Sequence, residues 1–184
     1  MRVAWLGRSP AWRAAAVAAA VALAGLGWWL GSPLFIRTTT FEALPSAAPL
    51  STAPTAAATA TAGSTTVPTA AGPVVLAEGQ LGYVDSVHNG KGPVRVVQVG
   101  SQILVRFDDV AITNAPDVHV YLSRETGGKW TDSTSLYLGP LKATNGSFNY
   151  DIPAGTDLAP YKSVVVWCRA FAVLITWADL TPRT

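Results

Sequence analysis

The feature that most limits how this chain can fold is the stretch at 161–177, YKSVVVWCRAFAVLITW. It is the densest run of β-branched and aromatic residues in the sequence, and such residues favour strands. Val164 and Cys168 would share one face of a strand, and Val165 and Trp167 the other. Apolar residues on both faces indicate a strand that is central or covered on both sides.

The same type of pattern extends over residues 74–184, where short apolar runs are separated by Gly, Asn, Asp and Pro. No long amphipathic helical pattern interrupts them. We therefore predict an all-β domain at 74–184, an antiparallel β-sandwich of two packed sheets. The predicted strands are Gly79–Val87, Val94–Val99, Gln102–Phe107, Asp117–Ser123, Leu136–Leu141, Phe148–Ile152, Ser163–Cys168 and Phe171–Trp177.

Upstream of this domain, residues 14–36 carry no charge. As a helix they would span about 34 Å, enough to cross the core of a bilayer. Arginines at positions 2, 8 and 13 precede the segment and Arg37 follows it, which favours a cytoplasmic N-terminus. We predict a cytoplasmic leader at 1–13, a transmembrane anchor at 14–36 and a cell-membrane protein whose domain lies outside the cytoplasm.

A cleaved signal peptide is the competing interpretation, because Ala22-Leu23-Ala24 is a small-residue cleavage motif after a short apolar region. Cleavage there would leave the strongly apolar GLGWWLGSPLFI as a new N-terminus with no surface to bury it. We favour the uncleaved signal anchor. Both alternatives place the rest of the chain outside the cytoplasm.

Residues 37–73 are mostly Ala, Thr, Pro and Ser, and Glu42 is their one acidic residue. Such a composition buries too little apolar surface to offset its chain entropy, so we expect a disordered linker. Its Thr, Ser and Pro content also fits a glycosylated stalk. A plain spacer is the simpler interpretation.

Charge and motifs exclude several classes of function. Residues 74–184 hold nine Lys or Arg and ten Asp or Glu, a formal charge of −1, so no basic patch points to nucleic acid. One cysteine excludes an intramolecular disulfide. Without a nucleophile elbow, a phosphate loop or a dinucleotide fingerprint, the sequence favours a protein that is not an enzyme.

Several motifs in the domain resemble the electron-transfer DM-thirteen family, a β-sandwich module related to the DOMON domain. The most specific are Ala-Pro-Asp-Val-His-Val-Tyr-Leu at 115–122 and Tyr-Lys-Ser-Val-Val-Val-Trp-Cys at 161–168, with Leu-Gly-Pro-Leu-Lys at 138–142 between them. The resemblance covers nearly all of 74–180. One departure is Ala115, where the family usually has a turn glycine.

The resemblance implies extracytoplasmic electron transfer or redox sensing with a signature cysteine, here Cys168. It also implies an unidentified redox or surface partner. Related sandwiches bind haem or sugars, so the cofactor stays open.

Cys168 itself has two interpretations. Free cysteine is among the most buried residue types and behaves as a small hydrophobe, and Val166 and Trp167 suit that role. If the thiol instead lies near the surface, Arg169 would favour a reactive thiolate. The sequence leaves both open.

The supporting site candidates are His88, Asp117, His119, Tyr121 and Trp167. His88 and His119 with Cys168 form a ligand set known from copper sites, but no histidine follows the cysteine and no methionine is available as an axial ligand. Haem would need one of the two histidines, and covalent attachment is excluded without Cys-x-x-Cys-His. Asp117 suits a cation or, more simply, a turn.

Two classes of function remain. The first is an electron-transfer or redox module centred on Cys168. The alternative is a surface ligand-binding or adhesion module with a structural cysteine, in which Trp130 and Tyr137 matter more. A purely structural stalk and head is a third option.

Overall fold

The computed structural model describes residues 10–32, 36–45 and 72–183, and one helix followed by short strands makes up these ranges. The helix is α1 (Pro10–Gly31). The strands are β1 (Thr39–Phe41), β2 (Val74–Gln80), β3 (Gly90–Lys91), β4 (Pro93–Val99), β5 (Gln102–Ile112), β6 (Val118–Ser123), β7 (Ser135–Pro140), β8 (Asn145–Ile152), β9 (Ser163–Cys168), β10 (Val173–Asp179) and β11 (Thr181–Pro182), with a short 3-10 helix η2 (Asp132–Thr134) before β7.

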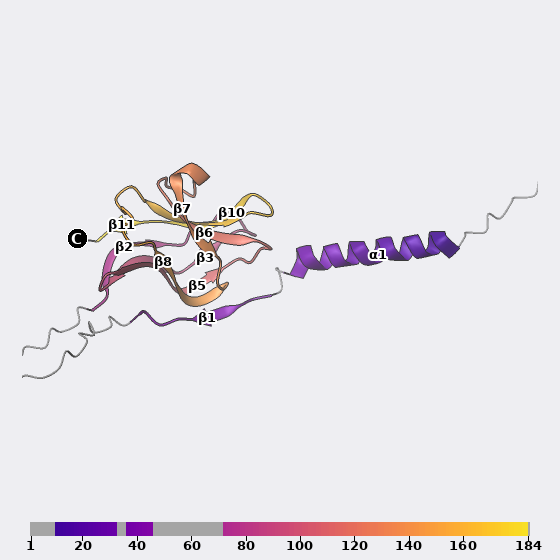
Figure 1. Cartoon of the computed structure of the whole chain (residues 1–184), viewed down its shortest axis with the longest axis horizontal. Coiled ribbons are helices and arrows are strands. Elements are labelled where there is room, and N and C mark those ends of the chain that lie inside the picture. The colour runs from indigo at the N-terminus through magenta and orange to yellow at the C-terminus, as the bar shows by residue number, and fades with distance from the viewer. Residues whose placement is uncertain (1–9, 33–35, 46–71, 184) are drawn as a thin grey trace, which may run out of the picture.

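The strands form two sheets that pack face to face (Figure 1). The larger sheet has the order β1-β8-β5-β4-β2-β11, with β3 paired to β5, and the smaller has the order β10-β9-β6-β7. All pairs are antiparallel except β1 with β8. The predicted β-sandwich behind one helix is confirmed.

The core lies between the two sheets and is built from the inward-facing residues of each strand. Phe107 and Phe148 of the larger sheet stack with ring centroids 5.0 Å apart, and both are fully buried. Val164, Val166 and Cys168 of β9 face them from the smaller sheet and are also fully buried. Each large apolar side chain buried in this way contributes roughly 2 kcal/mol to folding.

Most predicted strands are present, but the one at Gly79–Val87 is wrong. The strand there is β2, which ends at Gln80. After it the chain turns, because the Asp85 carboxylate accepts hydrogen bonds from the backbone N–H groups of Val87 and His88 at 2.7 and 2.6 Å. This side-chain capping of a turn outweighs the strand propensity of the valines.

The N-terminal part of the expected linker differs from the expectation, because residues 37–45 pack on the sandwich. β1 extends the larger sheet at its β8 edge, with Thr40 opposite Gly146. Gly146 has a φ of +103° and a Cβ there would overlap the Thr40 carbonyl oxygen, so glycine permits this close approach. The sheet therefore begins before residue 74.

Polar contacts hold this segment along β8. The Thr38 carbonyl accepts hydrogen bonds from the backbone N–H groups of Thr144 and Asn145 at 3.1 and 2.9 Å. Arg106 donates to the Glu42 carbonyl at 2.8 Å, and the Glu42 N–H donates to the Ser147 carbonyl at 2.7 Å. A low-hydrophobicity segment is ordered here because a preformed sheet edge satisfies its backbone groups.

As a consequence, the chain reaches the sandwich soon after α1 ends at Gly31, because the Ile36 carbonyl already accepts a hydrogen bond from the Asn114 side chain at 3.0 Å. Residues 46–71 of the expected linker lie outside the described residues, and they join two strands of one sheet, β1 and β2. They do not separate the domain from the helix.

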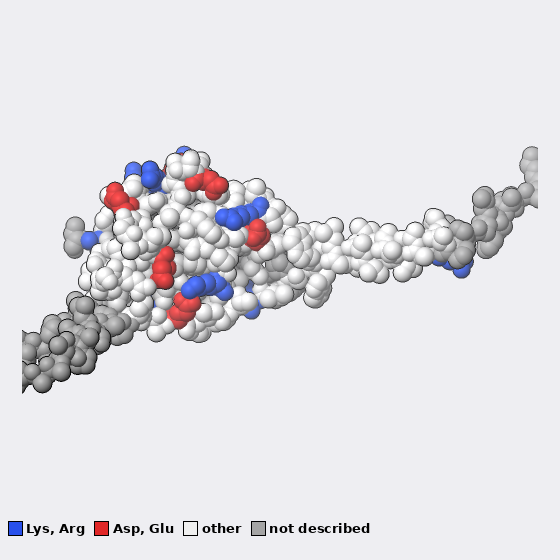
Figure 2. All heavy atoms as spheres, viewed as in Figure 1, with Lys and Arg blue, Asp and Glu red and all other residues white. Residues whose placement is uncertain are grey.

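Helix α1 extends away from the sandwich, and its surface is almost free of charge (Figures 1 and 2). Residues Ala11–Gly31 are long and apolar enough, by length and composition, to cross a membrane. A signal sequence would have the same properties. The helix begins at Pro10, whereas the anchor was predicted from residue 14; residues 1–9 and 33–35 lie outside the described part of the chain.

Candidate functional site

The outer face of the smaller sheet brings together aromatic and polar side chains from strands β6, β7 and β9 and from the loop between β6 and β7. Along β6, alternate residues point outward, so His119 and Tyr121 lie on this face while Val118 and Val120 enter the core. On β9, Trp167 lies opposite His119 and shares their face. Four of the six predicted site residues, Asp117, His119, Tyr121 and Trp167, therefore lie on one surface.

A bulge in the neighbouring strand completes this surface. Between β6 and β7 the register shifts at Val120 and Tyr121, so Tyr137 lies opposite Tyr121 and Gly139 opposite Val120, with Leu138 between them. Bulges re-aim side chains in this way. The Tyr137 side chain consequently lies beside the Tyr121 ring, with centroids 5.3 Å apart.

The loop between β6 and β7 folds across the sheet and adds Trp130. The Trp130 ring lies 4.4 Å from the Tyr121 ring and 5.2 Å from the Trp167 ring, measured between centroids. Ser123 fixes the loop by donating to the Lys129 carbonyl at 2.9 Å. We call Tyr121, Trp130, Tyr137 and Trp167 the aromatic face.

His119 connects the aromatic face to a carboxylate. Its Nδ1 lies 2.9 Å from the Tyr137 hydroxyl oxygen, and its Nε2 lies 2.6 Å from Oδ1 of Asp117. His119 is 9% exposed, whereas Tyr137 is 44% exposed. The three side chains form a continuous hydrogen-bonded series from the buried imidazole to a phenol at the surface.

Arg169, just after β9, lies over the rings of both Tyr121 and Tyr137. Its Nε donates to the Tyr121 hydroxyl at 2.6 Å, and its guanidinium lies 4.7 Å from the centroid of the Tyr137 ring. Burial raises the pKa of Tyr121, and the hydrogen bond from Arg169 acts in the opposite direction. The same hydrogen bond raises the pKa of Arg169.

Cys168 lies on the other side of the same sheet. Its side chain is fully buried among the core residues, together with Val164 and Val166. Arg169, which would favour a thiolate at the surface, contacts the tyrosines instead. The position of Cys168 is that of a small core hydrophobe.

His88 also lies apart from the aromatic face. Its Nδ1 is 2.8 Å from Oδ2 of Asp85, within its own turn. The hydrogen bond from the His88 ring is the main cause that lowers the pKa of Asp85 to about 2, and the backbone N–H groups of His88 and Val87 lower it further. The geometry assigns His88 to this turn.

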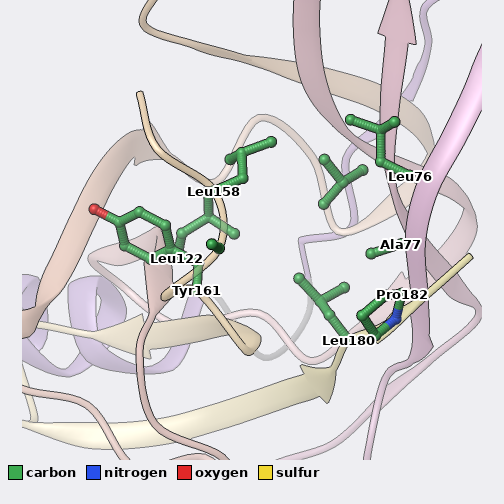
Figure 3. Close-up of a pocket in the computed structure, with 9 residues that line it drawn as sticks. Leu76, Ala77, Leu122, Leu158, Tyr161, Leu180 and Pro182 are labelled. Carbon is green, nitrogen blue, oxygen red and sulfur yellow. The ribbon is translucent and has the colours of Figure 1, made fainter. Parts of the chain in front are cut away.

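Within the described residues, no group of three or more His, Cys, Asp or Glu side chains is arranged to hold a metal ion. An apolar pocket of about 220 Å³ opens between the sheets, with Leu76, Leu122 and Leu158 pointing into it (Figure 3). Neither histidine nor Cys168 lines it. Its volume is below the roughly 300–1,000 Å³ typical of sites for small organic ligands.

Sequence reasoning identified four members of this surface but not its organisation. Trp130 and Tyr137 were expected to matter only for ligand binding, and Arg169 only as a neighbour of the thiol. The outward position of Tyr137 on a short alternating strand was the available signal. Its partner was not predictable, because the bulge at Leu138 sets the pairing.

These observations define a β-sandwich domain with a hydrogen-bonded aromatic face, preceded by one apolar helix. The chain belongs to the family described as electron transfer DM13, whose model matches residues 83–180. The resemblance in the sequence motifs is therefore confirmed.

Two solved structures of superoxide dismutase 5 from Candida albicans are similar to this chain. The copper(II) form has 11% sequence identity and a TM-score of 0.41, covering 60% of this chain and 94% of its own. A mutant with one glutamate replaced by alanine has 11% identity and a TM-score of 0.40, covering 59% and 90%. No curated protein sequence matches this chain.

Proposed function

We propose that this chain is a single-pass membrane protein whose β-sandwich transfers electrons outside the cytoplasm. Its membership of an electron-transfer family and its apolar helix support this proposal. The arginines at positions 2, 8 and 13, against Arg37 alone on the other side, favour a cytoplasmic N-terminus. In this proposal the partners are the membrane, through residues 14–36, and a redox protein at the domain surface.

The aromatic face is the observation that carries the proposal. Tyrosine and tryptophan are among the side chains most easily oxidised by one electron. From Tyr137 through Tyr121 and Trp130 to Trp167, successive ring centroids are 5.3, 4.4 and 5.2 Å apart. Rings in contact allow an electron vacancy to move in short steps, and the exposed Tyr137 offers a point of exchange with a partner.

Cys168 has a structural role in this proposal. The thiol lies in the core, on the opposite side of the sheet from the aromatic rings. A redox role for Cys168 would require a reagent or partner to reach between the two sheets. Thiol labelling of the native protein separates these alternatives.

The test is photo-oxidation of the full-length protein in lipid nanodiscs. Photogenerated tris(bipyridine)ruthenium(III) serves as the one-electron oxidant, and transient absorption follows tryptophan and tyrosine radicals. Trp130→Phe keeps an aromatic ring but interrupts the oxidisable series between Tyr121 and Trp167. We expect this variant to slow conversion of tryptophan radicals to tyrosine radicals.

Trp177→Phe is the matched control, because Trp177 is not part of the aromatic face. Its ring lies over Gly82, and its Nε1–H donates to Oδ2 of Asp179 at 3.4 Å. This variant is expected to retain wild-type conversion. Equal kinetics in wild type, Trp130→Phe and Trp177→Phe would contradict electron transfer through the aromatic face.

Ligand binding is the second candidate function, and the 44% exposure of Tyr137, on a face that also holds two partly buried tryptophans, favours it. Aromatic rings at a surface are common contacts for sugars and proteins. In that case Tyr137→Ala would abolish binding to an oligosaccharide array, whereas photo-oxidation would show no preference for the aromatic face.

A further inference from the structure

The hydrogen bonds around His119 define the direction in which a proton can move. The Asp117 carboxylate oxygen accepts a hydrogen bond, so the His119 Nε2 at 2.6 Å carries the hydrogen. In the neutral imidazole, Nδ1 then holds a lone pair. Nδ1 lies 2.9 Å from the Tyr137 hydroxyl oxygen, so the Tyr137 O–H donates its hydrogen bond to Nδ1.

This arrangement supplies what oxidation of a phenol requires. Loss of an electron makes the phenolic hydrogen strongly acidic, so oxidation is easier when a base already accepts its hydrogen bond. Asp117 faces the far side of the imidazole and stabilises the imidazolium formed when the proton arrives. A carboxylate behind a histidine orients the ring and its tautomer in the same way in hydrolases.

Arg169 strengthens the coupling between electron and proton. Its guanidinium lies over the Tyr137 ring, 4.7 Å from the centroid. A positive charge at this place disfavours a cationic tyrosine radical, so the ring loses its proton together with its electron. Tyr121 is a further titratable group beside Tyr137, and Arg169 holds its hydroxyl at 2.6 Å.

We propose that Tyr137 is a proton-coupled redox site, with His119 as its proton acceptor and Asp117 as the residue that positions and charge-balances His119. A one-electron oxidant, a metal centre of the partner protein, takes one electron from Tyr137. The phenolic O–H bond breaks and an N–H bond forms at His119 Nδ1. The products are a neutral tyrosyl radical, an imidazolium paired with Asp117 and a partner reduced by one electron.

The reverse step regenerates the resting state. A one-electron reductant returns the electron to the tyrosyl oxygen, and the proton moves back from Nδ1. His119 is 9% exposed, so the proton stays within the hydrogen bond during the cycle. This inference rests on the proposed electron-transfer function and names the site at which electrons enter or leave.

The test uses the same full-length protein in nanodiscs with photogenerated tris(bipyridine)ruthenium(III). Tyr137→Phe should remove most of the tyrosyl radical, whereas Tyr83→Phe, at a tyrosine 67% exposed and outside the aromatic face, should not. His119→Gln keeps a hydrogen-bond acceptor without a base. We expect it to slow formation of the Tyr137 radical roughly a hundredfold, the usual contribution of a positioned base.

We expect wild type to show a kinetic isotope effect in D₂O and His119→Gln to lose it. Asp117→Asn should slow the same step less and should retain an isotope effect, because His119 is still present as the proton acceptor. A measurement on the wild-type protein keeps the proposal testable even if a variant fails to fold. Electron–nuclear double resonance of the wild-type radical should show one strongly coupled exchangeable hydrogen, donated by the imidazolium.

The outcomes separate the two proposals. Tryptophan radicals in the aromatic face without a Tyr137 radical, or a Tyr137 radical without the exchangeable hydrogen, would overturn this inference and leave the proposed function in place. Wild-type rate and isotope effect in His119→Gln would also overturn it. Absence of any radical in the aromatic face would overturn the proposed function itself.

Discussion

The Glu42 carboxylate lies 2.9 Å from the ammonium group of Lys142, one hundred residues later in the chain. Its other oxygen accepts a hydrogen bond from the backbone N–H of Asn149 at 2.9 Å. Glu42 was expected to lie in a disordered linker, and it instead fixes β1 to the edge of the larger sheet. The sandwich is therefore attached close to the end of α1.

Glu42→Gln should loosen β1. Burial alone raises the pKa of Glu42, but the hydrogen bonds from Lys142 and Asn149 outweigh it and leave the pKa below its ordinary value. The carboxylate thus stabilises docking at neutral pH, and this contribution is lost as the pH falls through the lowered pKa. We expect the variant to weaken docking by about 1 kcal/mol.

Hydrogen exchange of residues 38–43, corrected for intrinsic rates, measures this change. Protection in wild type should fall on acidification below about pH 4, whereas protection in Glu42→Gln should be low and nearly independent of pH. Equal protection in the two proteins at neutral pH would show that the ion pair does not hold β1.

Gly146→Ala should displace β1 entirely. A Cβ at this position overlaps the Thr40 carbonyl oxygen, and the φ of +103° strains any side chain. Gly155→Ala is the matched control, since Gly155 also has a positive φ, +80°, but no atom lies within 4 Å of its Cβ. Both variants should lose stability, on the order of 1 kcal/mol from strain, but only Gly146→Ala should lose protection at 38–43.

Cys168 should resist thiol reagents in the folded protein. Because the side chain is fully buried, labelling by a maleimide should occur only on unfolding. Cys168→Ser should cost about 1–3 kcal/mol, because it buries a hydroxyl among apolar groups. Cys168→Ala should cost less, and thermal unfolding compares the two. Rapid labelling of the native protein would restore the redox role of the thiol.

Arg169→Gln should raise the pKa of Tyr121 further. Burial already raises it, and the guanidinium partly offsets that effect. Alkaline titration by ultraviolet absorbance should therefore show one tyrosine ionising at higher pH in the variant. Arg124→Gln is the control, because Arg124 lies over the Tyr161 ring at 5.7 Å and away from Tyr121. A shift of equal size in both variants would indicate a general change in charge.

Some features of this protein follow from local sequence alone. The alternation in β6 predicts that His119 and Tyr121 share a face, because successive side chains of a strand point to opposite sides. The hairpin of β4 and β5 was predictable from its turn, where Gly100 adopts a φ of +61°. The apolar helix was predictable from composition.

Other features depend on pairing between distant segments. Nothing in the sequence near Glu42 indicates that its carboxylate will pair with Lys142 and Asn149, since the sheet edge that carries them exists only when β8 has folded. The bulge at Leu138 likewise decides that Tyr137 meets Tyr121 and His119. A one-residue change in register moves a side chain to the other face, and local propensity does not specify that register.

The sequence by itself determined an all-β domain, an apolar N-terminal helix and the membership of its motifs in one family, because these depend on periodicity, composition and local order. The tertiary structure decided which residues meet. It buried Cys168 in the core, grouped four aromatic rings on the outer face of the smaller sheet and placed Nδ1 of His119 beside the Tyr137 hydroxyl. Contacts of this kind arise only when strands far apart in the chain pair in one register.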